Sequence, residues 1–336
     1  MSVDQPDSDP LLELRDVSVD FRLRDRTLRI VDGISLVIRK GQTLGLVGES
    51  GSGKSTVANA ILRLLPKRAH ARIGGSIVFG GRNLVQLPER DIRAVRGSRI
   101  AMIPQDPMSS LNPLFTVGSQ IEEALATHEA VRGRSARDAI IEILGRVRID
   151  SPETRIDQYP HELSGGMRQR VVGAIAMACA PELLLADEPT TALDVTVQAQ
   201  YLDMLKDLQR DSEMAVLFIT HDLGVIARIC DSVAVMYAGQ IVERAPVAAI
   251  FGNARHWYTR ALLASVPGSE PAGGRLASIA GAPLRPGASV PGCRFASRCP
   301  AAREQCRTAA PALEATGEAH AVRCWFPASE HPESTS

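Results

Sequence analysis

A glycine-rich segment of this chain has the residue types and the spacing that hold phosphate groups. Gly48–Ser55 reads Gly-Glu-Ser-Gly-Ser-Gly-Lys-Ser, and such a loop points its backbone amides at phosphate oxygens. Lys54 can reach the β- and γ-phosphates, and the Ser55 hydroxyl can ligate magnesium. The segment follows the apolar run Thr43–Val47 and opens the amphipathic run Lys54–Leu65, which is the strand, loop and helix context that the pattern requires. The residues predicted to contact a nucleotide here are Gly48, Ser50, Gly51, Gly53, Lys54, Ser55 and Thr56.

An acidic pair ends another apolar run. Leu183–Asp187 predicts a strand, and Asp187 would project from its carboxyl end, where open α/β sheets bind ligands. Asp187 can therefore hold magnesium, and Glu188 beside it can polarise the water that attacks a γ-phosphate. The alternative is an acidic pair that caps the turn at Pro189, but the phosphate loop upstream favours phosphoryl transfer.

A second potential anion site precedes a predicted helix. Ser164, Gly165 and Gly166 stand before the helical run that starts at Met167, so a hydroxyl and two glycine amides gather at a helix N-terminus. Taken alone, these residues indicate only a helix cap and a turn. One nucleotide does not need two phosphate cradles on one subunit. We therefore expect a head-to-tail pair of subunits, each completing the other's γ-phosphate site.

Two single polar residues follow apolar segments. Gln105 comes after Ile100-Ala-Met-Ile-Pro, where the chain enters a helical region, so it can sense magnesium or the attacking water. His221 follows Ala215–Thr220 and could contact a γ-phosphate through a neutral ring nitrogen. A lone glutamine or histidine is usually structural, and only the position of these two in the series favours a role in the site.

The elements that must position these residues predict an α/β fold. Alternation of apolar and polar residues predicts an antiparallel β region, over Leu11–Phe21, Leu28–Ile30 and Ile34–Ile38. Apolar runs that alternate with helical stretches predict a mostly parallel sheet covered on both faces. The runs are Leu183–Asp187, Ala215–Thr220 and Val233–Tyr237, and the helices are Val195–Gln209 and Leu223–Ile229. Helical spacing elsewhere predicts an α-rich insertion, over Asp91–Val95, Ile121–Ala126, Ala136–Val147 and Met167–Ala178.

Composition divides the chain into three predicted parts. Residues 1–10 are polar, so we expect a disordered tail and no secretory signal. Residues 11–264 would form the nucleotide-binding domain, with its helical insertion at about 106–170. Residues 265–336 begin with a Pro/Gly-rich linker and end in a cysteine-containing extension. No run approaches the roughly 18 apolar residues of a spanning helix. Lysine plus arginine equals aspartate plus glutamate, 38 against 38, which disfavours nucleic-acid binding.

The six cysteines fall into two groups. Cys179 and Cys230 stand alone in apolar segments, while the tail holds Cys293, Cys299, Cys306 and Cys324 with the spacing C-x5-C-x6-C-x17-C. Without an export signal the compartment is reducing, which favours a metal over disulfides. Four thiolates suit zinc or an iron–sulfur cluster, although zinc knuckles usually have tighter spacing. Reduced cysteines packing as small hydrophobes are the third possibility, and they fit poorly in a segment with little core of its own.

These motifs, in this order, resemble the ATP-binding subunits of bacterial ABC importers over nearly the whole chain. The resemblance implies a core of the ABC-type P-loop ATPase fold, with ATP and Mg²⁺ as cofactors and Ser55, Gln105 and Asp187 near the metal. It also implies the following roles: Gly48–Ser55 as Walker A loop, Gln105 as Q-loop, Ser164–Gln169 as signature, Asp187 as Walker B aspartate, Glu188 as catalytic glutamate, Thr191–Asp194 as D-loop and His221 as switch histidine. In the signature, Gly165, Gly166 and Gln169 would contact nucleotide with Ser164, as would Asp194 in the D-loop.

Three longer segments are similar to the dipeptide, oligopeptide and nickel importer ATPases, namely Gln105–Pro113, Ala186–Gln198 and Pro291–Pro300. That subfamily implies ATP-driven uptake of peptides or a related small solute at the cytoplasmic face of the inner membrane. Its partners would be a second cassette (identical or homologous), two membrane permeases and an extracytoplasmic solute-binding protein, with no nucleic acid.

The same resemblance bears on two further sites. Some relatives carry a 4Fe-4S centre at the tail cysteines, so we expect such a cluster at Cys293, Cys299, Cys306 and Cys324, with Zn²⁺ as the alternative. Relatives also stack adenine on an aromatic ring upstream of the phosphate loop. Phe21 is the candidate here, and a core residue of a β-strand is the alternative.

Two rival functions remain open at this point. One is a soluble ABC ATPase that acts on nucleic acid or ribosomes. The other is a metal-sensing regulator in which the cysteine tail is the main functional part.

Overall fold

The computed structural model describes residues 9–23, 25–106, 110–128, 134–191, 193–266, 278–317 and 319–328. Most of the predicted N-terminal tail lies outside these residues, as does the middle of the Pro/Gly-rich linker. The chain divides into two compact units. Unit 1 comprises Met1–Leu12, Ile38–Thr43 and Phe79–Ile219, and unit 2 comprises Glu13–Val37, Leu44–Val78 and Thr220–Ser336.

Unit 1 is built on parallel strands that are almost entirely buried. β7 (Leu183–Asp187) pairs in parallel with β6 (Ile100–Ile103) on one side and with β8 (Ala215–Thr220) on the other. Every residue of β7 and β8 is buried. This explains why each strand is a continuous apolar run, because a strand covered on both faces has no solvent side to make polar.

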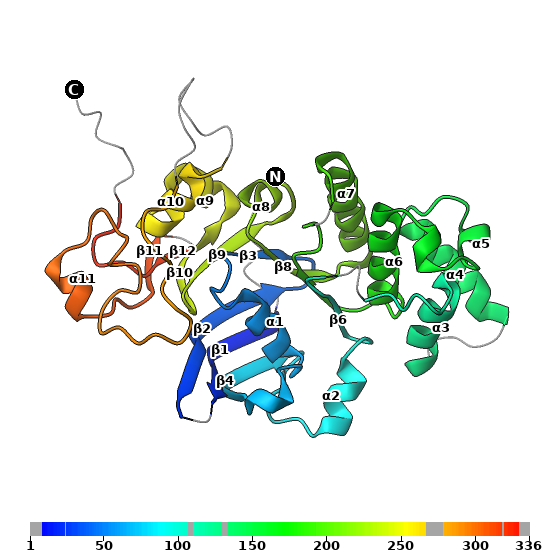
Figure 1. Ribbon diagram of the computed structural model, residues 1–336, viewed down its shortest axis with the longest axis horizontal. Coiled ribbons are helices and arrows are strands. Elements are labelled where there is room, and N and C mark those ends of the chain that lie inside the picture. The colour runs from blue at the N-terminus through cyan, green and yellow to red at the C-terminus, as the bar shows by residue number, and fades with distance from the viewer. Residues whose placement is uncertain are drawn as a thin grey trace. The chain divides into compact units, whose positions relative to one another are not determined.

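The helices of unit 1 follow the predicted helical spacing. α3 (Val117–Thr127), α4 (Arg134–Arg146) and α5 (Pro152–Arg155) lie together beside α6 (Gly165–Met177), as Figure 1 shows. Thr116 caps α3 by accepting a hydrogen bond from the Ser119 amide. The remaining elements of the unit are β5 (Arg82–Asn83), α2 (Glu89–Val95), a 3₁₀ turn at Pro160–Glu162 and α7 (Val195–Ser212).

Unit 2 contains most of an antiparallel sheet with the order β2, β1, β4. β1 (Pro10–Arg22) and β2 (Thr27–Arg39) are joined by a short turn, so they run antiparallel. β4 spans Arg72–Phe79. The predicted break between residues 30 and 34 is wrong, because β2 continues through Gly33, which has a φ of 61°. A glycine accepts this conformation without ending the strand.

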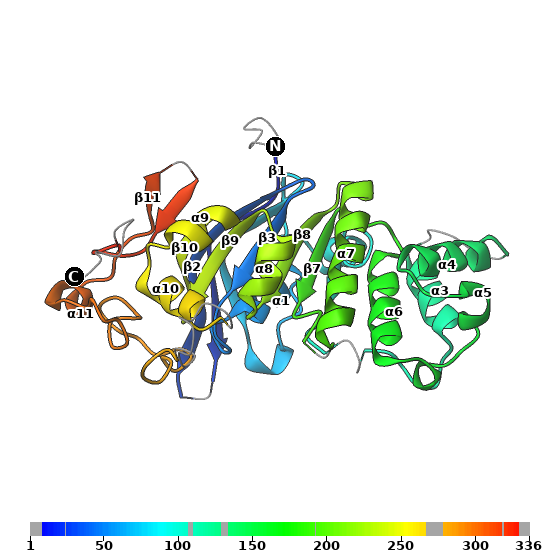
Figure 2. The ribbon, with the colours of Figure 1, turned by 90° about the horizontal axis from the view of Figure 1, so that it is seen from above.

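The second sheet of unit 2 carries the C-terminal extension. The strands of this sheet that lie in unit 2 follow the order β3 (Thr43–Val47), β9 (Ser232–Tyr237), β10 (Gln240–Pro246), β12 (His320–Val322) and β11 (Glu314–Gly317). β3 and β9 are parallel, whereas the other neighbours are antiparallel. Figure 2 shows α9 (Val247–Asn253) and α10 (Trp257–Ala264) along β9 and β10, with α8 (Leu223–Ile229) beside β3. The extension also holds a short helix, α11 (Glu304–Thr308).

A buried carboxylate in β10 binds a histidine of the extension. Glu243 in β10 is completely buried and accepts hydrogen bonds from the amides of Arg255 and His256, at 2.6 and 2.9 Å. The Nε2 atom of His320 in β12 lies 2.8 Å from the same carboxylate. A buried carboxylate is tolerated only when it has such partners, so the pairing of β10 with β12 depends on this group.

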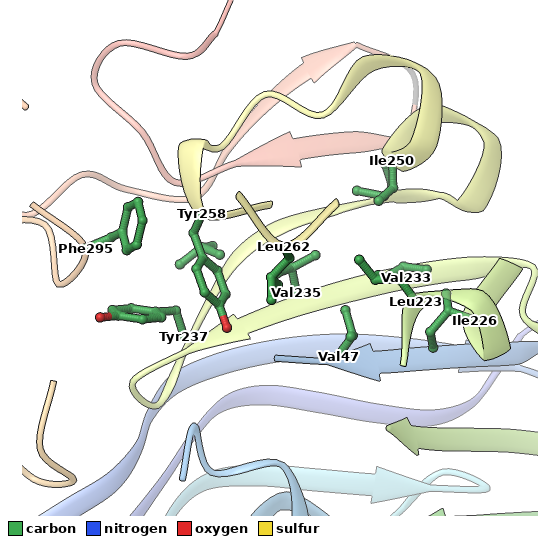
Figure 3. Close-up of a cluster of buried hydrophobic side chains, with 12 residues drawn as sticks. Val47, Leu223, Ile226, Val233, Val235, Tyr237, Ile250, Tyr258, Leu262 and Phe295 are labelled. Atoms are coloured by element: carbon green, nitrogen blue, oxygen red, sulfur yellow. The ribbon is translucent and has the colours of Figure 1, made fainter. Parts of the chain in front are cut away.

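The core of unit 2 includes a residue from the extension. Phe295 is 1% exposed and lies 5.3 and 5.4 Å, centroid to centroid, from the rings of Tyr237 and Tyr258 (Figure 3). The two tyrosine rings lie 4.6 Å apart. Aliphatic side chains from β3, β9, β10, α8, α9 and α10 complete the cluster. The extension is thus part of the hydrophobic core of unit 2.

Among the described residues, no helix is both long enough and apolar enough to cross a membrane.

Replacing Phe295 by Ala should destabilise unit 2 by roughly 3–5 kcal/mol, because a large buried ring is lost and a cavity is left. Phe251→Ala is the control, since Phe251 is 40% exposed and its removal should cost less than about 1 kcal/mol. Urea unfolding followed by tryptophan fluorescence measures the difference, because both tryptophans, Trp257 and Trp325, lie in unit 2. Equal unfolding midpoints for the two variants would show that Phe295 is no core residue.

Candidate nucleotide site

The phosphate loop lies in unit 2 between β3 and α1 (Lys54–Ile61). The helix begins at Lys54 as the glycine-rich pattern predicts, and it ends four residues earlier than the predicted Leu65. The buried ammonium of Lys54 donates to the carbonyls of Gly48 and Glu49, at 2.7 and 3.1 Å. The Ser52 hydroxyl is buried, and the described part of the chain offers it no hydrogen-bond partner. The loop therefore concentrates hydrogen-bond donors at a helix N-terminus, the arrangement that binds anions.

At two positions of the loop, only glycine fits the backbone conformation or the available space. Gly53 at the N-cap of α1 has a φ of 106°, a conformation that side chains rarely allow. Gly48 lies so close to β9 that an added Cβ would stand 2.1 Å from the carbonyl oxygen of Met236. The loop can take this path only because both positions lack a side chain.

The acidic pair lies in unit 1, at the end of β7. Asp187 is buried and pairs across the sheet with Ile219 of β8. Glu188 has a φ of 49°, which costs energy for a residue with a side chain, and its amide donates to the Ile219 carbonyl at 2.9 Å. Its Oε2 accepts from the Thr191 hydroxyl at 3.2 Å. The backbone and the side chain of Glu188 are therefore both held in place.

The serine and glycines of the second predicted anion site begin α6. Ser164 is the N-cap, and its Oγ accepts from the Met167 amide at 3.3 Å. The helix starts at Gly165, two residues before the predicted start, and an added Cβ on Gly165 would meet open space. Gln169 is buried and donates to the carbonyl of Pro189, so it links α6 to the segment after Glu188.

The remaining predicted residues occupy strand and helix ends. Gln105 is exposed and follows β6, and His221 is exposed and follows β8 in the sequence. Asp194 caps α7, with Oδ1 accepting from the amides of Thr196 and Val197 at 3.0 Å each. Phe21 is half-buried near the end of β1, so its part in binding adenine stays a prediction.

The predicted site residues thus fall into two groups. Unit 2 holds Phe21, Gly48–Thr56 and His221, and unit 1 holds Gln105, Ser164–Gln169, Asp187, Glu188 and Asp194. Within each group the residues stand at strand ends and helix N-termini, as the motifs predict. Their individual roles toward ATP remain predictions.

The prediction of an iron–sulfur cluster in the tail, or of zinc in its place, is wrong. Within the described ranges, no three or more His, Cys, Asp or Glu side chains form a group that could hold a metal ion. The four tail cysteines do line one small cavity, of about 10 Å³, together with the aromatic rings of Trp257, Phe295 and Trp325. A volume of that size has room for about one water molecule.

The cysteine environment gives the physical reason for this correction. Burial raises the thiol pKa of Cys293 and of Cys299, and it raises the pKa of Cys324 to about 11. Without a bound metal, these surroundings favour the protonated thiol. We expected little core for the tail to pack against, yet Cys293 and Cys299 pack against the hydrophobic core of unit 2. They are small apolar side chains of that core.

Two residues in contact with the phosphate loop were missed from the sequence. The Glu49 amide donates to the hydroxyl of Tyr258 at 2.8 Å, and the Glu49 carboxylate pairs with Arg298. Arg298 belongs to the segment Pro291–Pro300, in which the sequence predicted a site role for the cysteines alone. An arginine among apolar residues and cysteines was the available signal, since a buried arginine requires an acidic partner.

The phosphate loop, the acidic pair at a strand end and the serine-capped glycine helix define an ATP-binding cassette, and comparisons with known proteins agree. The sequence model of the family described as ABC transporter matches residues 31–191. The dimeric cassette MJ0796, solved with ADP and Pi, has a TM-score of 0.63 to this chain and is 26% identical. The match covers 70% of this chain and 98% of that one. The chain is an ABC-type ATPase.

More specifically, the chain belongs to the ATP-binding proteins of peptide ABC transporters. It is 50% identical to a probable peptide ABC transporter ATP-binding protein of Sinorhizobium fredii, over 95% of this chain and 96% of the relative. It is 43% identical to the dipeptide transport ATP-binding protein DppD of Bacillus subtilis, over 94% of each. The oligopeptide/dipeptide transporter C-terminal region matches residues 242–306. These relatives do not favour the alternative of an ATPase that acts on nucleic acid or ribosomes.

Gly48→Ala should lower the affinity for ATP by at least about tenfold, because the new methyl group would displace the loop from the Met236 carbonyl. Gly252→Ala is the matched control, since an added Cβ there meets no atom within 4 Å. Isothermal titration with ATP measures both. Unchanged affinity in folded Gly48→Ala protein would show that this close approach does not shape the nucleotide site.

Proposed function

We propose that this chain is the ATP-hydrolysing subunit that energises an importer of peptides or a related small solute. The observation that carries the proposal is the similarity to peptide transporter ATP-binding proteins over 95% of the chain, extension included. The subunit would act at the cytoplasmic face of a membrane. It would do so with a second identical or homologous cassette, two permeases and an extracytoplasmic solute-binding protein.

The phosphates of ATP would be held by the loop Gly48–Ser55. Lys54 supplies positive charge, and the N-terminus of α1 supplies amides. Ser55, Gln105 and Asp187 offer hydroxyl, amide and carboxylate oxygens, the ligand types that suit Mg²⁺. Bound Mg²⁺ would neutralise charge on the β- and γ-phosphates. Phe21 would contact the adenine ring.

Glu188 would orient and polarise the attacking water. Its positive φ and its bond to Thr191 fix the carboxylate in direction, and phosphoryl transfer depends mainly on such positioning. His221 would contact the γ-phosphate, and Gln105 would report the state of the nucleotide to the helical region. Gln169 would hold the start of α6 against the segment that follows Glu188.

Ser164, Gly165 and Gly166 would bind the γ-phosphate of the partner cassette, with Asp194 at the same interface. Gly165 has open space around it, and Ser164 presents its hydroxyl at the N-terminus of a 13-residue helix. The permeases would dock on the surface after Gln105, where Leu114 is 79% exposed and Phe115 is 54% exposed.

Glu188→Gln should keep ATP binding and lower hydrolysis at least a hundredfold, because the amide cannot polarise water. In proteoliposomes that hold the complete complex, ATP-driven uptake of di- and oligopeptides, measured by mass spectrometry, should stop as well. Glu213→Gln is the matched control, since the Glu213 side chain is 71% exposed and pairs only with Lys40 among the ion pairs described. Normal hydrolysis by Glu188→Gln would remove this residue from the mechanism, and a wild-type complex that takes up no peptide would refute the import function.

Ser164→Arg should leave ATP binding by the monomer intact while hydrolysis falls at least a hundredfold, because the arginine blocks the anion site that a second cassette needs. Ser164→Thr keeps the capping hydroxyl and serves as the control. Light scattering with and without ATP reports dimer formation. Loss of nucleotide binding by the folded monomer would mean that Ser164 acts on the nucleotide of its own subunit.

A further inference from the structure

The C-terminal extension contacts the phosphate loop through an ion pair. The guanidinium of Arg298 meets the carboxylate of Glu49 with two parallel hydrogen bonds, of 2.6 and 2.9 Å. The two residues are 249 positions apart and both lie in unit 2. Glu49 falls in the part matched by the ABC transporter family, and Arg298 falls in the part matched by the oligopeptide/dipeptide C-terminal region. The pair therefore joins the part of the chain matched by the ABC transporter family to the part matched by the oligopeptide/dipeptide C-terminal region.

Arg298 is itself fixed from several sides. Its side chain is 2% exposed, and Nε donates to the carbonyl of Ala280 at 2.9 Å. The guanidinium carbon lies 5.8 Å from the ring centroids of both Tyr237 and Phe295. A buried guanidinium needs a negative partner, and here Glu49 supplies it. The two-pronged geometry also orients the partner carboxylate, which a single point charge would not do.

Glu49 stands where an unpaired carboxylate would oppose ATP. It follows Gly48 directly, and its carbonyl accepts from the Lys54 ammonium, the group expected to clamp the phosphates. A free negative charge at this position would repel a polyphosphate at short range. Pairing with Arg298 neutralises that charge. The Tyr258 hydroxyl holds the Glu49 amide at the same time, so the extension and α10 fix one residue of the loop between them.

The extension also meets the loop at a second place. Pro283, Leu284, Arg285 and Pro286 line a cavity of about 190 Å³ together with Glu49–Ser52 of the loop. An added Cβ on Gly51 would stand 4.0 Å from the Pro286 side chain. The loop is thus bordered by the extension next to the ion pair as well.

We propose that Arg298 is a positioning residue for ATP, which holds and neutralises Glu49 so that nucleotide affinity depends on the C-terminal extension. The inference rests on the proposed function in one respect, the binding of phosphates by Gly48–Ser55. It adds a role for a part of the chain that the ATP motifs do not include.

The test is isothermal titration of the full-length chain with ATP in the presence of Mg²⁺. Arg298→Gln should weaken binding about tenfold, because it leaves a bare carboxylate beside the phosphates. Adding Glu49→Gln to that variant should restore most of the affinity, since the repelling charge is then gone. The loss in Arg298→Gln should also shrink when salt is raised from about 50 mM to about 500 mM, because salt screens the repulsion. A merely structural role for Arg298 predicts neither the rescue nor the salt effect.

Arg323→Gln is the matched control. Arg323 is another arginine of the extension, and its guanidinium donates to the carbonyls of Ile241 and Pro311. Its loss should leave ATP affinity unchanged. If Arg298→Gln does not fold, Arg298→Met with and without Glu49→Gln carries the same comparison, because methionine has an unbranched apolar stem without charge and also leaves the carboxylate unpaired.

Unchanged ATP affinity in folded Arg298→Gln would overturn the inference, as would a double variant as weak as the single one. An equal loss in Arg323→Gln would overturn it too, because any damage to the extension would then suffice. Lys54→Ala separates this inference from the proposed function. If Lys54→Ala binds ATP normally, the assignment of the loop itself fails, and if only Arg298→Gln binds normally, the role of the extension fails alone.

Discussion

The packing of three aromatic rings, Tyr237, Tyr258 and Phe295, is the interaction on which unit 2 depends most. Tyr237 ends β9, Tyr258 is the second residue of α10 and Phe295 comes from the extension, so one buried contact unites three segments. Large rings bury much apolar surface, and their polar hydroxyls need partners when the ring is buried. The Tyr258 hydroxyl finds its partner in the Glu49 amide, and the Tyr237 ring faces Arg298. The hydrophobic core and the phosphate loop are for this reason held by the same side chains.

In unit 1, the functional groups are fixed at the ends of buried strands. The parallel strands are buried on both faces, so charged residues can appear only where a strand ends. Asp187 and Glu188 occupy such an end, and Glu188 adopts a backbone conformation that costs energy. The hydrogen bond from its amide to Ile219 and the buried amide of Gln169 near Pro189 hold this segment in place. Strain of this kind is retained where the surrounding structure over-determines it, and functional sites are the usual location.

The spacing of the four tail cysteines led to a wrong prediction of a metal site. Four cysteines in a segment rich in proline and glycine suggested a metal, since such a segment cannot build a core alone. The structure gives the segment a core that it shares, through Phe295 and the pairing of β12 with β10. Packing against unit 2 stabilises the segment, and burial favours the neutral form of the thiols.

Local patterns in the sequence determined the elements and the motif positions. Strands β3, β7 and β8 and helix α8 have the predicted bounds, because a buried strand is a continuous apolar run and a helix shows its period over a few turns. The start of α1 at Lys54 followed from the glycine-rich pattern as well. Only the tertiary structure decided that β2 continues through Gly33, that Gln169 is buried against Pro189 and that Arg298 pairs with Glu49. The physical reason is the separation along the chain. Residue spacing predicts contacts between residues a few positions apart, whereas a contact across 249 positions depends on how whole elements pack.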